Sequence, residues 1–224
     1  MKMARPVAAG VSVLAAVGLS LEAAHLGQAD TIVAESNAKL ESTGWRKSPP
    51  SLDAWIEVRN ELLEAERLAP GSPAVSESLG VLHARRSSSR EFLIYARDYF
   101  AHSLQARPTS PYTWANYAEA KYLLGETGRP FEEALMSAAR LGPWEPEVQR
   151  LIADLGLAVY HEVKPETRAV IASLVALGMR RNSLEILQIS DKRGRLDVAC
   201  MHVPNNRRVT DPQWIERCRK ARPQ

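Results

Sequence analysis

The 224-residue sequence lacks the signatures of the common enzyme classes. It has no Gly-x-Ser-x-Gly elbow for a serine nucleophile and no glycine-rich loop for phosphate. His161-Glu162 begins like a zinc-protease helix, but Pro165 stands where the second histidine would be required. His83 and His102 stand isolated among apolar residues and are expected on helix surfaces, not as metal ligands. We therefore expect no catalytic site, no metal site and no cofactor.

Signals for β-structure are missing as well. Asn-Gly and Asp-Gly turns do not occur, and β-branched residues do not alternate with polar ones. Alanine, leucine, glutamate and arginine recur instead, and 45% hydrophobic with 25% charged residues is an ordinary globular balance. The sequence predicts an all-α protein.

Aromatic residues make up only 6% of the chain, and no aromatic platform is interleaved with the arginines near the C-terminus. Residues 180–224 carry 11 Lys and Arg against 5 Asp and Glu, a net charge of +6 that leaves −3 for the rest of a chain whose total is +3. A basic tail could bind nucleic acid, an anionic membrane surface or an acidic polymer, or it could be an ordinary solvated surface. Without stacking aromatics, nucleic acid is the weakest of these partners, and none is expected.

Charge is absent from residues 7–21, a run that follows Lys2 and Arg5. A spanning helix needs roughly 20 apolar residues, so this run is short for a membrane helix and also fits a cleaved secretory signal. We favour an uncleaved single-pass anchor over residues 1–27. Either interpretation keeps the basic N-terminus in the cytoplasm and places the rest of the chain across the membrane, in the periplasm.

The chain has only two cysteines, Cys200 and Cys218, both in its C-terminal part. An even number in an exported chain permits one disulfide, which would close a loop of roughly 20 residues and contribute about 3 kcal/mol. Two buried free thiols are the alternative. A metal site is not expected, because a Cys-x-x-Cys pair is missing.

Prolines open three helical stretches, at Ser72-Pro73, Ser110-Pro111 and Glu145-Pro146, with spacings of 38 and 35 residues. Proline suits a helix start because the first turn has no use for its missing N–H. The spacing is typical of helix-hairpin repeats of the tetratricopeptide type, which build binding surfaces. The second hairpin fits the large-small pattern best, with Trp114, Tyr117, Ala118, Leu124, Gly125, Ala134, Ala138 and Pro143.

These patterns divide the chain into four parts. After the anchor or signal segment over 1–27 we expect a linker helix over 28–50, a tetratricopeptide-like repeat domain over 51–162 and a basic C-terminal helical subdomain over 163–224. Two good repeats are few, so flanking helices must cap the stack.

In repeats of this type the first helix of each hairpin lines the concave face. With Trp114 taken as the first consensus position, the positions on this face can be assigned in its repeat and in the next one. They carry tyrosines, carboxylates and an arginine, which suit a polar peptide or a sugar polymer. An ordinary solvated helix face is the alternative. The candidate groove residues are Tyr112, Glu119, Tyr122, Glu147, Arg150 and Asp154.

Four stretches have a distinctive sequence: RPTSPYTWAN (107–116), LGPWEPEVQ (141–149), ADLGLA (153–158) and RGRL (193–196), the last followed by Cys200. Together they resemble the VpsP-type polysaccharide-biosynthesis proteins, small tetratricopeptide-like components of bacterial exopolysaccharide clusters. The similarity covers about residues 50–205. It implies an accessory protein of the bacterial inner membrane that helps a polymerase or export complex and has no activity of its own. It carries over a pathway and no site residues.

The combined expectation is a non-catalytic adaptor or scaffold in exopolysaccharide biosynthesis, assembly or export. Its partners would be components of that complex or the polymer itself. A generic adaptor for another envelope machine shares every feature except the family wording. A polymer-modifying enzyme is the remaining alternative, in which Glu147 and Asp154, about 10 Å apart along one helix, would act as acid and base, one with a raised pKa.

Overall fold

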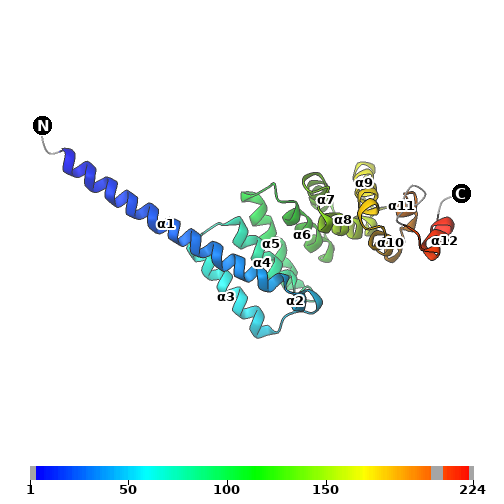
Figure 1. Ribbon diagram of the computed structural model, residues 1–224, viewed down its shortest axis with the longest axis horizontal. Helices are drawn as coiled ribbons and strands as arrows, with labels where there is room; N and C mark the ends of the chain where they lie inside the picture. Colours follow the sequence, from blue (N-terminus) through cyan, green and yellow to red (C-terminus); the bar gives the residue numbers. More distant parts are fainter. Residues whose placement is uncertain (1–3, 203–208, 222–224) are drawn as a thin grey trace.

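The structure is a computed structural model that describes residues 4–202 and 209–221, with side chains from Gly18 onward except at positions 46 and 47. This described part contains twelve helices and no strand, so the prediction of an all-α protein is confirmed. The helices follow one another along the molecule, and the first extends from one end (Figure 1). Their bounds are α1 (Ala4–Glu41), α2 (Thr43–Lys47), α3 (Leu52–Leu68), α4 (Pro73–Ala84), α5 (Arg90–Ala106), α6 (Pro111–Leu123), α7 (Arg129–Leu141), α8 (Pro146–Ala158), α9 (Pro165–Arg181), α10 (Ser183–Lys192), α11 (Leu196–Cys200) and α12 (Pro212–Ala221).

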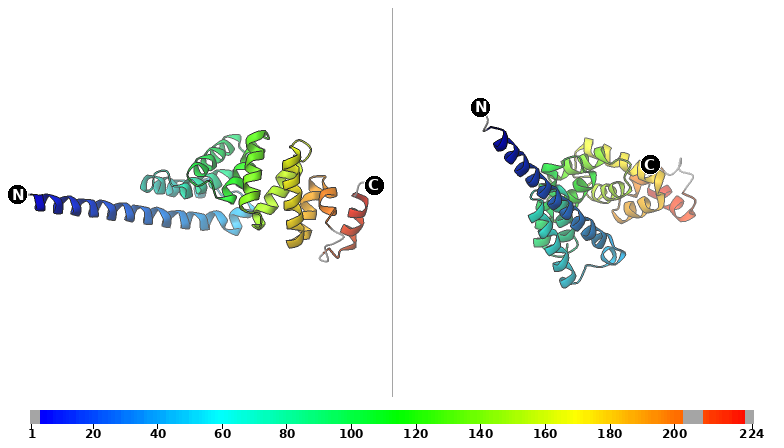
Figure 2. Two further views of the ribbon diagram at one scale, coloured as in Figure 1. Left: turned by 90° about the horizontal axis from the view of Figure 1, so that it is seen from above. Right: turned by 60° about the vertical axis from the view of Figure 1, so that its left-hand side comes forward.

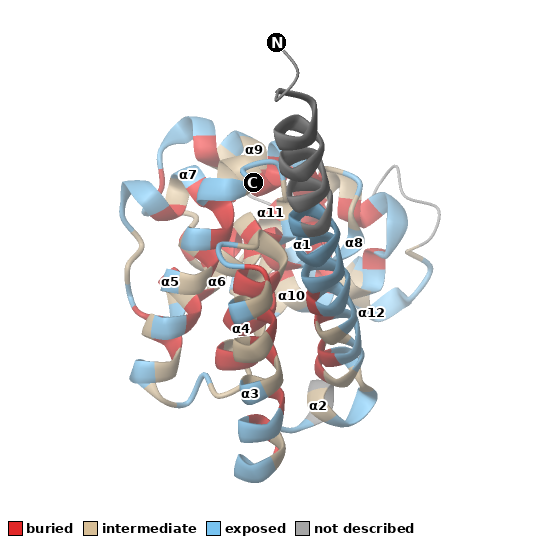
Figure 3. Cartoon of the chain, turned by 90° about the vertical axis from the view of Figure 1, so that its left-hand side faces the viewer, coloured by how far each residue is buried: buried red, intermediate tan, exposed pale blue. Residues whose placement is uncertain are grey.

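Helix α1 runs without a break across position 27, where the sequence suggested that an N-terminal segment gives way to a linker. Its C-terminal half packs on α3 and α4 and buries Ala29, Val33 and Leu40. Residues 18–28 are all exposed, because this part of α1 projects beyond the body (Figures 2 and 3). The linker helix is therefore the packed end of a longer rod.

None of the helices is both long and apolar enough to cross a membrane, within the part of the chain whose side chains are described. The apolar run over 7–21, expected to form the anchor, lies mostly outside that part, which begins at Gly18. The anchor stays a prediction from the sequence.

Antiparallel helix pairs make up the body. Helix α4 packs along α5, α6 along α7 and α8 along α9, and α1 with α3 forms a further pair ahead of them. The first helix of each pair also contacts the first helix of the next, so α1, α4, α6, α8 and α10 form a continuous row. We call this row the inner helices.

Proline begins α4, α6, α8 and α9, so the three proline-opened starts expected from the sequence coincide with helix starts. At α6 the hydroxyl of Ser110 also accepts a hydrogen bond from Thr113 N, at 3.3 Å, which satisfies one of the free N–H groups of the first turn.

Glycines allow the paired helices to approach closely. A β-carbon on Gly80 of α4 would lie 2.6 Å from Cε1 of Phe100 on α5, and one on Gly156 of α8 would lie 2.6 Å from Cγ1 of Ile171 on α9. Real β-carbons do not come that close to a neighbour, so these helix pairs depend on glycine at their crossings.

His83 is buried, with 6% of its surface exposed, so the expectation of a surface histidine is wrong. Its ring centroid lies 5.2 Å from those of Trp55 and Tyr95, 5.4 Å from Tyr99 and 5.7 Å from Phe92. Nδ1 finds no hydrogen-bond partner among the described residues. Burial, with a contribution from the charge of Arg59, lowers the pKa of His83 to about 4.

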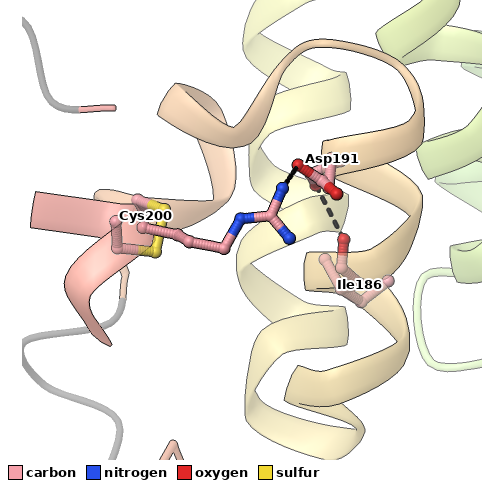
Figure 4. Close-up of a disulfide and its surroundings, with 6 residues drawn as sticks. Ile186, Asp191 and Cys200 are labelled. Carbon is pink, nitrogen blue, oxygen red and sulfur yellow. Dashed lines mark hydrogen bonds and ion pairs between the residues drawn. A yellow bond between two sulfur atoms is a disulfide. The ribbon is translucent and has the colours of Figure 1, made fainter. Parts of the chain in front are cut away.

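Cys200 of α11 and Cys218 of α12 form a disulfide, with Cα atoms 5.1 Å apart. Both residues are buried. An ion pair between Arg217 of α12 and Asp191 of α10 lies beside it, as Figure 4 shows. Of the two possibilities left open by the sequence, the structure has the disulfide, and the last helix is held to the body through it.

Candidate binding surface on the inner helices

The six candidate groove residues lie on two neighbouring inner helices that contact each other. Helix α6 carries Tyr112, Glu119 and Tyr122, and α8 carries the other three. From Tyr112 to Tyr122 a helix rises about 15 Å. The residues are therefore spread along one surface, and they fall into three local groups.

The first group joins Tyr122 and Asp154 through an arginine from the end of α10. Arg193 donates two hydrogen bonds to Asp154, from Nε to Oδ1 at 2.8 Å and from Nη2 to Oδ2 at 2.7 Å. Its Nη1 lies 3.4 Å from the hydroxyl oxygen of Tyr122, and its guanidinium carbon lies 5.7 Å from the centroid of the Tyr122 ring. This two-bond geometry fixes the relative position of the three side chains.

The arginine also determines the ionisation of Asp154. Burial by itself would raise the pKa of this carboxyl, but the hydrogen bonds and charge of Arg193 outweigh it and hold the pKa below its usual value. An acid catalyst needs the opposite, a raised pKa that keeps its proton near neutral pH. Asp154 is thus poorly suited to the role of acid in the enzyme alternative.

The second group is Glu119 with Arg150. Glu119 is partly buried, and no hydrogen bond to its carboxyl is found among the described residues. Burial raises the pKa of Glu119, the charge of Arg150 partly offsets this, and Asp154 raises it further. Arg150 is exposed and makes no hydrogen bond within the described part of the chain. An acceptor and a donor are therefore left for another molecule on this face.

The third group lies at the N-terminal ends of the two helices. The hydroxyl of Tyr112 donates a hydrogen bond to a carboxylate oxygen of Glu145, the residue just before α8. This bond is the main cause that raises the pKa of Tyr112 to about 12, and the charge of Glu147 adds to it. Tyr112 is 39% exposed and Glu147 is exposed, so both remain accessible.

The sequence patterns missed the arginine that organises the first group. Arg193 belongs to the RGRL stretch (193–196), to which the sequence patterns assigned no role in the surface. A bend forms there because Gly194 has φ +67°, which glycine adopts without strain. Arg195, on the other side of the bend, bonds Asp197 at 2.7 Å and lies 4.6 Å above the ring of Tyr160. The turn therefore ties the C-terminal helices to α6, α8 and the segment after α8.

The groups on this surface can form hydrogen bonds with another molecule. They are the carboxyl of Glu119, the guanidinium of Arg150, and the tyrosines Tyr112 and Tyr122. Tyr122 lies beside the ion pair that Arg193 forms with Asp154. Within the described residues there is no group of three or more His, Cys, Asp or Glu side chains that could hold a metal ion.

Comparison of the sequence with protein-family models finds no match, and comparison with curated proteins finds none either.

Proposed function

We propose that this chain is a non-catalytic, membrane-anchored adaptor in the periplasm that acts in exopolysaccharide biosynthesis, assembly or export. The observation that carries the proposal is the surface of α6 and α8, where Glu119 and Arg150 lack hydrogen-bond partners among the described residues. A carboxyl and a guanidinium on neighbouring helices of one surface can hold a ligand that both donates and accepts hydrogen bonds, such as a polar peptide or a sugar polymer.

The helix pairs support a tetratricopeptide-like architecture. Successive pairs begin with proline at spacings of 38 and 35 residues, and each first helix contacts the next first helix. The pair formed by α1 and α3 extends the array toward the N-terminus. Arrays of this kind use a row of first helices as their binding surface.

The placement in the membrane and the periplasm has two supports. Lys2 and Arg5 precede an apolar run, and α1 continues from that run into the packed body. The disulfide between Cys200 and Cys218 suits an oxidising compartment such as the bacterial periplasm. The pathway itself comes from the resemblance to VpsP-type proteins.

The proposal is tested with a bacterial strain that lacks this chain. Extracellular polysaccharide is quantified and its size distribution is measured, with complementation by the wild type and by the Glu119→Gln, Arg150→Gln double variant. Arg140→Gln is the matched control, because Arg140 is an exposed arginine on α7, outside the inner helices.

We expect lost or shortened polymer, rescue by the wild type and the control, and failure of the double variant, which must reach wild-type levels in the membrane fraction. Unchanged polymer in the deletion strain would refute the pathway and leave a generic envelope adaptor. A mature protein found free in the cytoplasm would refute the anchored periplasmic placement.

A further inference from the structure

Trp144 is unusual among the tryptophans of this chain. Its side chain is 68% exposed, whereas the other four are buried or half-buried. It lies in the short connection between α7 and α8. Burying an indole ring ordinarily stabilises a protein, so the exposed ring of Trp144 leaves a large apolar face available to another molecule.

The backbone that carries this ring is held on both sides. Nε2 of Gln149 donates to the carbonyl oxygen of Pro143 at 2.7 Å, and Nη1 of Arg181 donates to that of Trp144 at 2.5 Å. The Tyr112 hydroxyl bonds Glu145, the residue that follows Trp144. Helices α6, α8 and α9 thus fix the connection. A ring presented on a fixed backbone loses little conformational entropy when it binds.

The neighbourhood is polar and mixed in charge. Glu145 and Glu147 supply carboxylates, Arg181 supplies a cation, and Tyr112 supplies a second, 39% exposed ring. In tight protein–protein interfaces, the anchoring aromatic residues lie in a broad packed core that contains few charged residues. Here hydrogen-bonding groups border one flat ring, and Leu141, three residues before it, is 37% exposed.

We propose that Trp144, with Tyr112 and Glu145, forms a binding platform for a saccharide chain. The axial C–H groups of a pyranose ring form an apolar face that stacks on an indole, while its hydroxyls both donate and accept hydrogen bonds. The carboxylates of Glu145 and Glu147 accept from those hydroxyls. An extended sugar chain can stack on the one ring and bond the groups on both sides of it, so the alternation of ring and hydrogen-bonding groups fits a saccharide.

This platform is separate from the Glu119 and Arg150 pair and does not depend on it. Trp144 precedes α8, whereas Arg150 lies inside it and Glu119 lies toward the other end of α6. The inference goes beyond the proposed function, since a second contact would let the chain hold a polymer at two points. Either site can fail without the other.

The test uses the full chain in detergent micelles, labelled with 5-fluorotryptophan, whose five fluorine signals report the five tryptophans. The signal of Trp144 is identified by its loss in Trp144→Phe. Alginate oligosaccharides are the anionic probe and dextran oligosaccharides the neutral one. We expect at least one probe to shift the Trp144 signal saturably and to leave the signal of buried Trp55 in place.

Trp144→Ala should weaken binding roughly tenfold or more, the size expected for losing an aromatic contact. Tyr95→Ala, which removes another exposed aromatic ring on α5, should bind like the wild type. No shift with either probe, or unchanged affinity of Trp144→Ala, would overturn the platform.

Discussion

Acidification should destabilise this protein through one buried side chain, His83. Its pKa is about 4 in the folded chain against an ordinary value of 6.5, because burial disfavours the charged ring. The unfolded state therefore takes up a proton first as the pH falls. Stability is fully present above about pH 6.5 and is lost progressively between about pH 6.5 and pH 4.

The size of the effect follows from the shift. A difference of about 2.5 pKa units corresponds to about 3 kcal/mol. Tyr95, one of the rings that touch His83, is 46% exposed, so water reaches the edge of the cluster and screens part of the penalty. We expect a loss of about 2 to 3 kcal/mol in the free energy of unfolding across this range.

The assay is urea unfolding of the full chain in detergent micelles, followed by circular dichroism at several pH values between about 7.5 and 4. His83→Phe removes the titrating group and keeps an aromatic ring among Trp55, Phe92, Tyr95 and Tyr99. Subtracting its curve from that of the wild type cancels the carboxylates that titrate in the same range. His102→Gln is the control for losing an exposed histidine.

We expect the wild type to lose stability over this range and His83→Phe to lose much less. Equal slopes for the two proteins would refute the reasoning, because they would show that the ring can be charged at no cost. If His102→Gln, and not His83→Phe, removed the loss of stability, the effect would belong to His102 and the reasoning would be wrong.

Three further results are expected. Gly80→Ala should lower the free energy of urea unfolding by about 1 to 3 kcal/mol, because its β-carbon would lie 2.6 Å from the Phe100 ring; the better helix propensity of alanine offsets up to about 1 kcal/mol of this loss. Gly44→Ala is the control, because a β-carbon there has nothing within 4 Å. Equal stability of the two variants would contradict the close approach. Arg193→Gln should lower the free energy of unfolding by about 1 to 3 kcal/mol and raise the pKa of Asp154, which is measured from the pH dependence of its carboxyl chemical shift. Arg193→Lys should recover only part of the lost stability, because lysine cannot form the two-bond contact. An unmoved pKa would show that the ion pair is weak. Cys200→Ser with Cys218→Ser should speed hydrogen exchange of α12 and leave α6 to α8 unchanged, and equal exchange in α12 would mean that packing alone holds it.

Local signals in the sequence were enough to predict the helix class and several helix starts. Pro73, Pro111 and Pro146 mark their helices because their effect is confined to one turn. The environment of His83 could not be predicted in the same way. Its burial depends on rings from α3 and α5, which no pattern within α4 reveals.

The candidate surface shows the same division. The repeat spacing predicted that α6 and α8 lie together, and they do contact each other. It could not predict that Arg193, 39 residues beyond Asp154, returns to lock that carboxylate. Nor does a spacing rule distinguish Trp144, which is 68% exposed, from the half-buried Trp114. Contacts made across the fold decide both.

Because α1 is unbroken, the number of residues in its projecting part sets both the height and the orientation of the binding surface on the inner helices. Residues 18–28 form a free-standing stretch of about 16 Å, and the same helix then becomes the first inner helix. In a chain anchored as proposed, one residue inserted in this stretch would turn the inner surface by about 100° about the helix axis, whereas seven would restore its direction to within about 20° and lift it by about 10 Å. Insertions and deletions in this stretch would thus change the distance of the surface from the membrane and the direction that it faces.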